Sequence, residues 1–252
     1  MHSVFGDESA DQHNKKVFAV AGVLGDEHQW AAIRSEWSAL TKGRIFHAAD
    51  CEAGYGVWQG IAEHIRHRLH RDLTRLLANS GLVGWGVGID LAGCLRAFPE
   101  ARHDQPYYSC FFRTVFYLSS KAALFIPRDT VEFIFDSHPV TNFNSGVLYR
   151  YMVEQGNWQT QPVMKKKISF ASRQDIGIQI ADLWAREVMK RLDEYLRDSR
   201  SIPRLQWSTL RDSKRFGADF QVEEYFQDLK RQIVSASGRM HQAGRFGSAP
   251  RG

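Results

Sequence analysis

The chain has 252 residues, of which 43% are hydrophobic and 24% charged, with a net charge of +5 and a pI of about 9.1. A chain of this length and composition can bury a substantial core as a folded globular protein. No apolar run approaches the ~20 residues that a membrane-spanning helix needs, and the acidic start MHSVFGDESADQ lacks the regions of a signal peptide. The mildly basic balance permits a nucleic-acid partner without requiring one, because many basic proteins bind none.

The cysteines point to a reducing compartment. Cys51, Cys94 and Cys110 are isolated and show neither a metal-ligand spacing nor a disulfide framework. We therefore expect a cytoplasmic protein whose cysteines fill its core.

The first third of the chain predicts a hairpin followed by helices. An apolar segment at residues 3–6 and a near-continuous apolar run at residues 17–24 are typical of two strands joined by a polar turn. Asp7 and Glu8 would then lie at the end of the first strand. Downstream, the pattern predicts a helix over 28–40, a connector over 44–56, a long helix over 57–79 and a third strand over 82–90.

The remainder alternates helices with strands. The β-prone run VEFIFDS, residues 131–137, places Asp136 at the carboxyl end of a buried strand, where open α/β sheets form their sites. Around it the sequence predicts a short helix or turn over 91–102, helices over 107–125 and 144–155, a strand over 168–171, and helices over 175–189 and 219–234. We expect residues 1–234 to form a single domain and residues 235–252 to be a disordered tail.

The stretch DIGIQIADLWAREVM, residues 175–189, is the most regular helical pattern. At ~100° per residue its apolar residues share one arc, and a neighbouring arc holds the polar residues Asp175, Gln179, Asp182 and Arg186. Asp182 lies at the border, so a helix docked through its apolar arc would hold one carboxylate at the lip of the space above. The alternative is that these polar groups form a solvated face.

These patterns allow acidic side chains from distant segments to meet. If the first and fourth strands are neighbours, Asp7, Asp136 and Asp182 can converge on one edge of the sheet. His47, three residues before Asp50, is either a metal or catalytic group or a hydrogen-bonded structural histidine.

Basic residues provide candidates for contacting a nucleic acid. The lysines Lys165, Lys166 and Lys167, the segment 197–216 and the Arg-bearing tail could grip a phosphate backbone, in which case binding would weaken as salt rises. No GxSxG elbow, GxxxxGK[ST] loop or helix-opening GxGxxG occurs, so no nucleotide or nicotinamide cofactor is implied.

A family resemblance rests on the ordered motifs FGDES, FAVAGVL, FHAAD, IFDS and GIQIADLWA. Over residues 3–195 the chain resembles the family catalogued as domain of unknown function 3800, although Ala10 stands where that family often has glycine. The resemblance implies an α/β fold, a ribonuclease H-like mixed five-stranded sheet flanked by helices with helical insertions. It also implies a carboxylate site whose matching residues here are Asp7, Glu8, Asp136, Gln179 and Asp182.

Crowded carboxylates repel one another, and a divalent cation such as Mg²⁺ or Mn²⁺ removes that repulsion. We hypothesise that Asp7 bridges two metal ions, that Asp136 and Asp182 each hold one side, and that Glu8 is a ligand or a supporting group. Gln179 would orient a ligand or touch substrate. Arg186 would pair with phosphate or form a salt bridge to Asp182.

Two functions follow from this hypothesis. The first is a metal-dependent nuclease or related phosphodiester-cleaving enzyme acting on RNA or DNA. The alternative is a catalytically silent ribonuclease H-like module that binds nucleic acid or a protein partner. Acids at all the carboxylate positions favour the enzyme.

Overall fold

The computed structural model describes the chain apart from residues 12–14, 101–104, 126–129, 138–141, 156–162 and 246–252. Its strands are β1 (His2–Ala10), β2 (Val17–Asp26), β3 (Val83–Asp90), β4 (Val131–Asp136), β5 (Ser169–Ala171) and β6 (Phe216–Gln221). They form one six-stranded sheet in the order β5-β4-β1-β2-β3-β6.

The sheet is mixed. The early strands pair antiparallel, β1 with β2 and β2 with β3. The later strands pair in parallel, β4 with β1, β5 with β4 and β6 with β3. The first and fourth strands are therefore neighbours, which is the condition that the convergence of the acidic side chains required.

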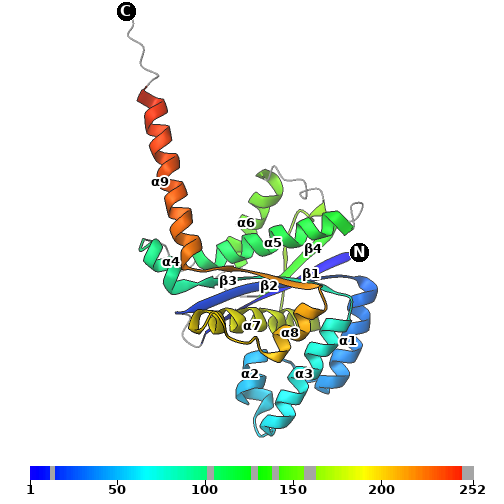
Figure 1. Ribbon diagram of the computed structural model, residues 1–252. Coiled ribbons are helices and arrows are strands. Elements are labelled where there is room, and N and C mark those ends of the chain that lie inside the picture. Colours follow the sequence, from blue (N-terminus) through cyan, green and yellow to red (C-terminus); the bar gives the residue numbers. More distant parts are fainter. Residues whose placement is uncertain (12–14, 101–104, 126–129, 138–141, 156–162, 246–252) are drawn as a thin grey trace, which may run out of the picture.

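Helices cover both faces of this sheet. They are α1 (Glu27–Thr41), α2 (Ala48–Ala53), the 3-10 helix η1 (Gly56–Trp58), α3 (Glu63–Asn79), α4 (Leu91–Ala97), α5 (Gln105–Phe125), α6 (Asn142–Gln155), α7 (Ile176–Arg197), α8 (Leu205–Asp212) and α9 (Glu223–Arg245). Figure 1 shows α5 and α6 on one face and α7 on the other, with α1, α2, α3 and α8 on the α7 side. The expected fold class, an α/β mixed sheet flanked by helices, is confirmed.

Strand alternation divides the core into two layers. On β1, Phe5 joins the core beneath α7 whereas its neighbour Val4 joins the core beneath α5, because successive strand residues point to opposite faces. β2 is buried along nearly its whole length, which explains its continuous apolar run. Among the described residues, no helix has both the length and the apolarity to cross a membrane.

The prediction of five strands was wrong, because β6 adds a sixth at the edge beside β3. Its sequence, FGADFQ, is short, contains glycine and alternates poorly, so hydrophobic periodicity does not reveal it. β1 runs to Ala10, so Asp7 and Glu8 lie within the strand and not at its end.

Two helices also differ from the prediction. The segment 44–56, expected as a connector, contains the short helix α2. The last helix begins at Glu223 and continues to Arg245, so residues 235–245 of the expected disordered tail are helical. The remainder of that tail, residues 246–252, lies outside the described residues.

Candidate active site

Two of the predicted acids lie next to each other on neighbouring parallel strands. β1 and β4 are in register up to the pair Gly6 and Phe135. Asp7 and Asp136 are the next residue on each strand, so their backbones lie side by side at the carboxyl end of β4. The sequence VEFIFDS predicted a candidate site at this end of the sheet, because it ends a buried strand at Asp136.

The pleat turns both carboxylates toward α7. Phe5 packs against the α7 side of the sheet, and Asp7 follows it by two residues on the same strand. Phe135 contacts the ring of Phe111 on α5, so the next residue, Asp136, points to the opposite face. Both acids therefore face the helix that carries Asp182.

Asp182 is held by the segment that enters α2. Its Oδ2 accepts a hydrogen bond of 2.6 Å from the backbone N–H of Ala48. The imidazole of His47 lies near the other carboxylate oxygen of Asp182, with Nε2 of His47 3.9 Å from Oδ1 of Asp182. Nδ1 of His47 lies 2.8 Å from Oδ2 of Asp50. His47 thus lies beside Asp182 and within ion-pair distance of Asp50, although its Nδ1 forms no hydrogen bond within the described residues.

The three aspartates form one electrostatic cluster around Asp7, a residue that is 2% exposed. Burial raises the pKa of Asp7 well above its usual value, and the charges of Asp182, Glu8 and Asp136 raise it further. A backbone N–H of Glu8 donates to Oδ1 of Asp7 at 2.7 Å and opposes that rise. Oδ2 of Asp7 is buried and accepts no hydrogen bond from the described residues.

Glu8 lies on the other face of β1, as the alternation of strand residues requires. The pKa of Glu8 is nevertheless raised to about 7. Burial is the largest cause and the charge of Asp136 the second, while the charge of Arg173 lowers the pKa. The charge of Glu8 therefore acts on the aspartates by repulsion, and it raises the pKa of Asp7.

Arg173 is a site residue that the sequence analysis missed. It lies in the turn between β5 and α7, with Nε 3.5 Å from Oδ2 of Asp136, and its side chain is half-exposed. Burial lowers its pKa, but the charges of Asp7, Asp136 and Asp182 raise it to a larger extent. The signal available was its position, immediately before the helix that carries Asp182.

Gln179 binds the protein itself. Its Oε1 accepts hydrogen bonds from Nε1 of Trp37 and from the backbone N–H of Phe46, both at 3.1 Å. Its Nε2 donates to the backbone carbonyl of Arg173 at 2.9 Å. The buried amide therefore ties three segments together: α1, the strap leading to His47, and the turn that carries Arg173.

Replacing Gln179 by leucine is expected to lower the free energy of unfolding by about 2–4 kcal/mol, because buried partners lose their hydrogen bonds. The matched control is Gln174→Leu in the same turn, where the side chain is exposed and the change should stay within about 0.5 kcal/mol. Urea unfolding of both variants measures the difference. Equal stabilities would contradict the positioning role of Gln179.

Arg186 is engaged elsewhere than expected. One turn after Asp182, its Nη2 and Nε contact Oε2 of Glu52 on α2 at 2.7 and 3.0 Å. This ion pair joins α2 to α7. It thereby helps to hold the backbone N–H of Ala48, the first residue of α2, in its hydrogen bond to Asp182. Arg186 still lowers the pKa of Asp182, which burial raises above its usual value.

A second group of possible metal ligands, Glu52, His70 and Glu187, lies behind this ion pair. Cations already surround it: Arg204 contacts both glutamates, at 3.2 and 3.5 Å. Burial opposes ionisation of Glu52, yet Arg186, Lys190 and Arg204 together lower its pKa to about 2. The group is thus neutralised internally, unlike the aspartate cluster.

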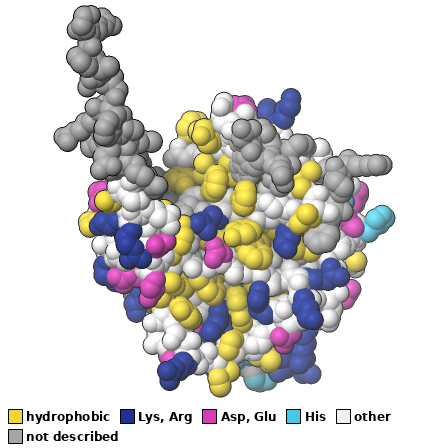
Figure 2. Space-filling model, turned by 45° about the horizontal axis from the view of Figure 1, so that its top comes forward, with side chains coloured by type: hydrophobic (Ala, Val, Ile, Leu, Met, Phe, Trp, Pro, Cys, Tyr) yellow, Lys and Arg dark blue, Asp and Glu magenta, His cyan; other side chains and the backbone are white. Residues whose placement is uncertain are grey.

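The predicted lysine cluster is not brought to the aspartates. The backbone N–H of Lys165 bonds to the carbonyl of Val131, at the opposite end of β4 from Asp136. Its ammonium pairs with Glu132 at 2.7 Å, while Lys166 and Lys167 are exposed. Figure 2 shows that basic side chains are scattered among hydrophobic ones over the visible face and do not form a single belt.

The comparisons with known proteins bear on the fold and not on the sequence family. No protein-family model matches the sequence, and no curated protein matches it significantly. The resemblance to the domain of unknown function 3800 family therefore stays a prediction. Among solved structures, the chain is similar to Bst ribonuclease HIII in complex with Mn²⁺, at 12% identity and a TM-score of 0.49. The alignment covers 78% of this chain and only 55% of that one, and it concerns the fold alone.

Proposed function

We propose that the protein is a metal-dependent nuclease or related phosphodiester-cleaving enzyme, with Asp7, Asp136 and Asp182 as metal ligands. The observation that carries this proposal is that the charges of Asp136 on β4 and Asp182 on α7 act on buried Asp7 of β1, whose Oδ2 has no hydrogen-bond partner among the described residues. A buried acceptor of this kind is costly unless a hydrogen-bond donor or a cation compensates for its lost hydration.

The donor set fits a hard divalent cation. Every candidate ligand is a carboxylate oxygen, which Mg²⁺ and Mn²⁺ prefer. A bound cation would also cancel the mutual repulsion that raises the pKa of Asp7. When bound, such ions activate water and stabilise the leaving oxygen in phosphodiester hydrolysis.

The chain's own groups would bind and orient the substrate. Arg173 is half-exposed beside Asp136, so its guanidinium would contact a phosphate oxygen of the strand to be cut. His47, beside Asp182, would donate a second hydrogen bond to the phosphate. Gln179 and Arg186 would act as positioning residues, because their polar atoms hold the segments that carry Arg173 and Ala48.

We propose that the substrate is nucleic acid and that the protein is cytoplasmic. A cluster of carboxylates handling divalent cations suits a substrate of repeated phosphates. All three cysteines are free and buried, which fits a reducing compartment.

The test is incubation of the purified protein with labelled single- and double-stranded RNA and DNA in Mg²⁺, in Mn²⁺ or in EDTA. Cleavage is expected with a divalent ion and not in EDTA. Asp7→Asn and Asp136→Asn, purified in parallel, identify contaminants: if both cut as fast as the wild type, the proposal fails. Nucleic-acid binding without cleavage under any condition would instead support a catalytically silent module.

A further inference from the structure

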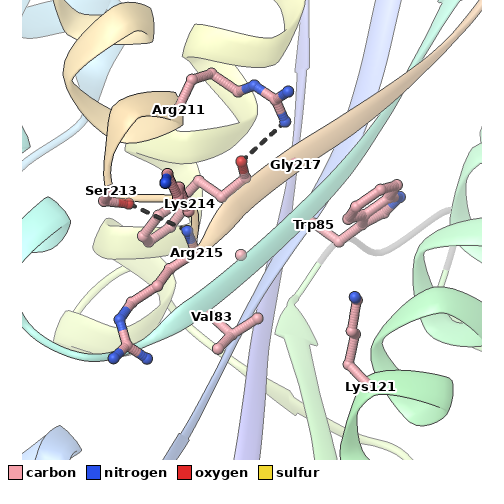
Figure 3. Close-up of a pocket in the computed structure, with 10 residues that line it drawn as sticks. Val83, Trp85, Lys121, Arg211, Ser213, Lys214, Arg215 and Gly217 are labelled. Atoms are coloured by element: carbon pink, nitrogen blue, oxygen red, sulfur yellow. Dashed lines mark hydrogen bonds between the residues drawn. The ribbon is translucent and has the colours of Figure 1, made fainter.

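A basic pocket lies at the β6 edge of the sheet (Figure 3). Its volume is about 570 Å³, and it lies between the first residues of β3 and β6, the turn before β6, and Lys121 of α5. β6 is three strands away from β1, roughly 14 Å at the usual strand spacing, so the pocket is separate from the aspartate cluster. Its cations are Lys121, Arg211, Lys214 and Arg215.

The charge of this pocket is not neutralised. Neither aspartate nor glutamate lines it, and no carboxylate of the described chain is ion-paired with Lys121, Lys214 or Arg215. Arg215 spends one donor on the carbonyl of Gly81 at 3.2 Å, which leaves the other N–H groups of its guanidinium for a ligand. Figure 3 shows the Lys121 ammonium reaching toward Trp85.

Arg211 has a different role. It donates to the carbonyl of Phe216 at 3.0 Å and lies over the ring of Trp207. These contacts join the end of α8 to the first residue of β6, so Arg211 builds the wall of the pocket.

Lys214 occupies a backbone conformation that favours glycine. Its φ is +60°, in the left-handed region, in the turn between α8 and β6. Glycine would adopt that conformation without strain, whereas lysine adds a positive charge to the pocket at some cost in stability. Lys42, at the end of α1, has the same kind of conformation with φ +54° and does not line the pocket.

An aromatic wall completes the pocket. Trp85 stacks on Tyr117, with ring centroids 4.6 Å apart. Gly217, across from Trp85 on β6, has no side chain, and a Cβ there would collide with the indole. The indole of Trp85 is therefore packed between Tyr117 and the backbone of Gly217, and its partly exposed part lies beside the cations. Aromatic side chains beside cations are a combination that grooves for nucleic-acid strands use.

We propose that this pocket binds the phosphate backbone of a nucleic-acid strand, with Lys121, Lys214 and Arg215 contacting phosphates and Trp85 contacting the adjoining sugar. Its volume is within the range of pockets that hold a nucleotide-sized ligand, and its cations come from two separate elements, so they can hold more than one phosphate. The inference rests on the proposed function only for the choice of a nucleic acid as the polyanion.

The experiment measures fluorescence anisotropy of a labelled short single-stranded oligonucleotide, as DNA and as RNA, with the full-length protein in EDTA over a range of salt. Lys214→Gly is expected to weaken binding about three- to tenfold and to reduce the slope of log affinity against log salt by about one. Arg215→Gln should act similarly. Lys42→Gly is the matched control, because it removes the same charge from the same backbone conformation outside the pocket, and it should change neither quantity.

Loss of folding cannot explain the expected result, since glycine relieves the strain at position 214 and should not lower the melting temperature. Unchanged affinity and salt slope in both Lys214→Gly and Arg215→Gln would overturn the inference and leave these cations as protection for the sheet edge. EDTA separates the two proposals. Binding that depends on Lys214 in a protein that never cleaves would support the pocket and refute the nuclease, and cleavage with unaltered binding would do the reverse.

Discussion

Asp136→Asn is expected to lower metal-dependent cleavage at least about a thousandfold, because losing one carboxylate ligand removes several kcal/mol of charge stabilisation in the transition state. The amide has nearly the same shape as the carboxylate, and within the described parts of the chain the ion-pair partner of Asp136 is half-exposed Arg173, so the fold should survive. Initial rates of cleavage, measured over a range of Mn²⁺ concentrations, give the size of the loss.

Asp228→Asn is the control for this prediction. It makes the same chemical change on α9, where Asp228 is exposed and pairs with Arg231, and it should leave the rate unchanged. Full activity in Asp136→Asn would remove Asp136 from the proposed ligand set. A loss that high Mn²⁺ partly restores would indicate that Asp136 contributes to metal affinity.

Asp7→Asn is expected to stabilise the metal-free protein while it abolishes activity. The folded state raises the pKa of Asp7 above 3.8 through burial and the neighbouring acids, so near neutral pH the folded protein either binds a proton that the unfolded chain lacks or holds a costly buried charge. The free energy of unfolding of the wild type therefore falls as the pH rises above the pKa that Asp7 has in the unfolded chain. Asparagine removes this penalty, and we expect the free energy of unfolding near pH 7 to increase by about 1–3 kcal/mol.

Urea unfolding in EDTA at two pH values tests the sign. The advantage of Asp7→Asn should be present near pH 7 and should shrink toward about pH 3, where the wild-type carboxyl is protonated in both states. Adding Mn²⁺ should stabilise the wild type by binding its folded state, and stabilise Asp7→Asn less. A variant that is less stable than the wild type at every pH would show that the Asp7 carboxylate is structurally required and carries no electrostatic strain.

Local patterns sufficed for much of the fold. The helical arc of α7 was visible because buried residues recur at the helical period over many turns. The buried strands β2 and β4 were visible as apolar runs. β6 was not, because an edge strand that is half-exposed needs no strong pattern: its ladder with β3 holds it. The helix α2 was missed for a similar reason, since six residues carry too little periodicity and its contacts with α7 decide its shape.

The candidate site divides in the same way. Asp7, Asp136 and Asp182 could be nominated from sequence, because each lies at a recognisable place on a strand or helix. Gln179 and Arg186 could be found but not assigned, since whether a polar side chain meets substrate or protein depends on what lies across from it. The structure gives them Trp37, Phe46, Arg173 and Glu52 as partners.

The amino-acid sequence by itself determined which side chains carry charge, which stretches are helices or buried strands, and which face each residue of those stretches presents. Tertiary structure alone decided that β1 lies beside β4, that Arg173 enters the aspartate cluster, and that Lys165 stays at the far end of β4. The physical reason is the distance along the chain over which each signal acts. Periodicity reports the environment within a few residues along the chain, whereas proximity between carboxylates depends on strand order and register, which are set by packing between segments more than a hundred residues apart.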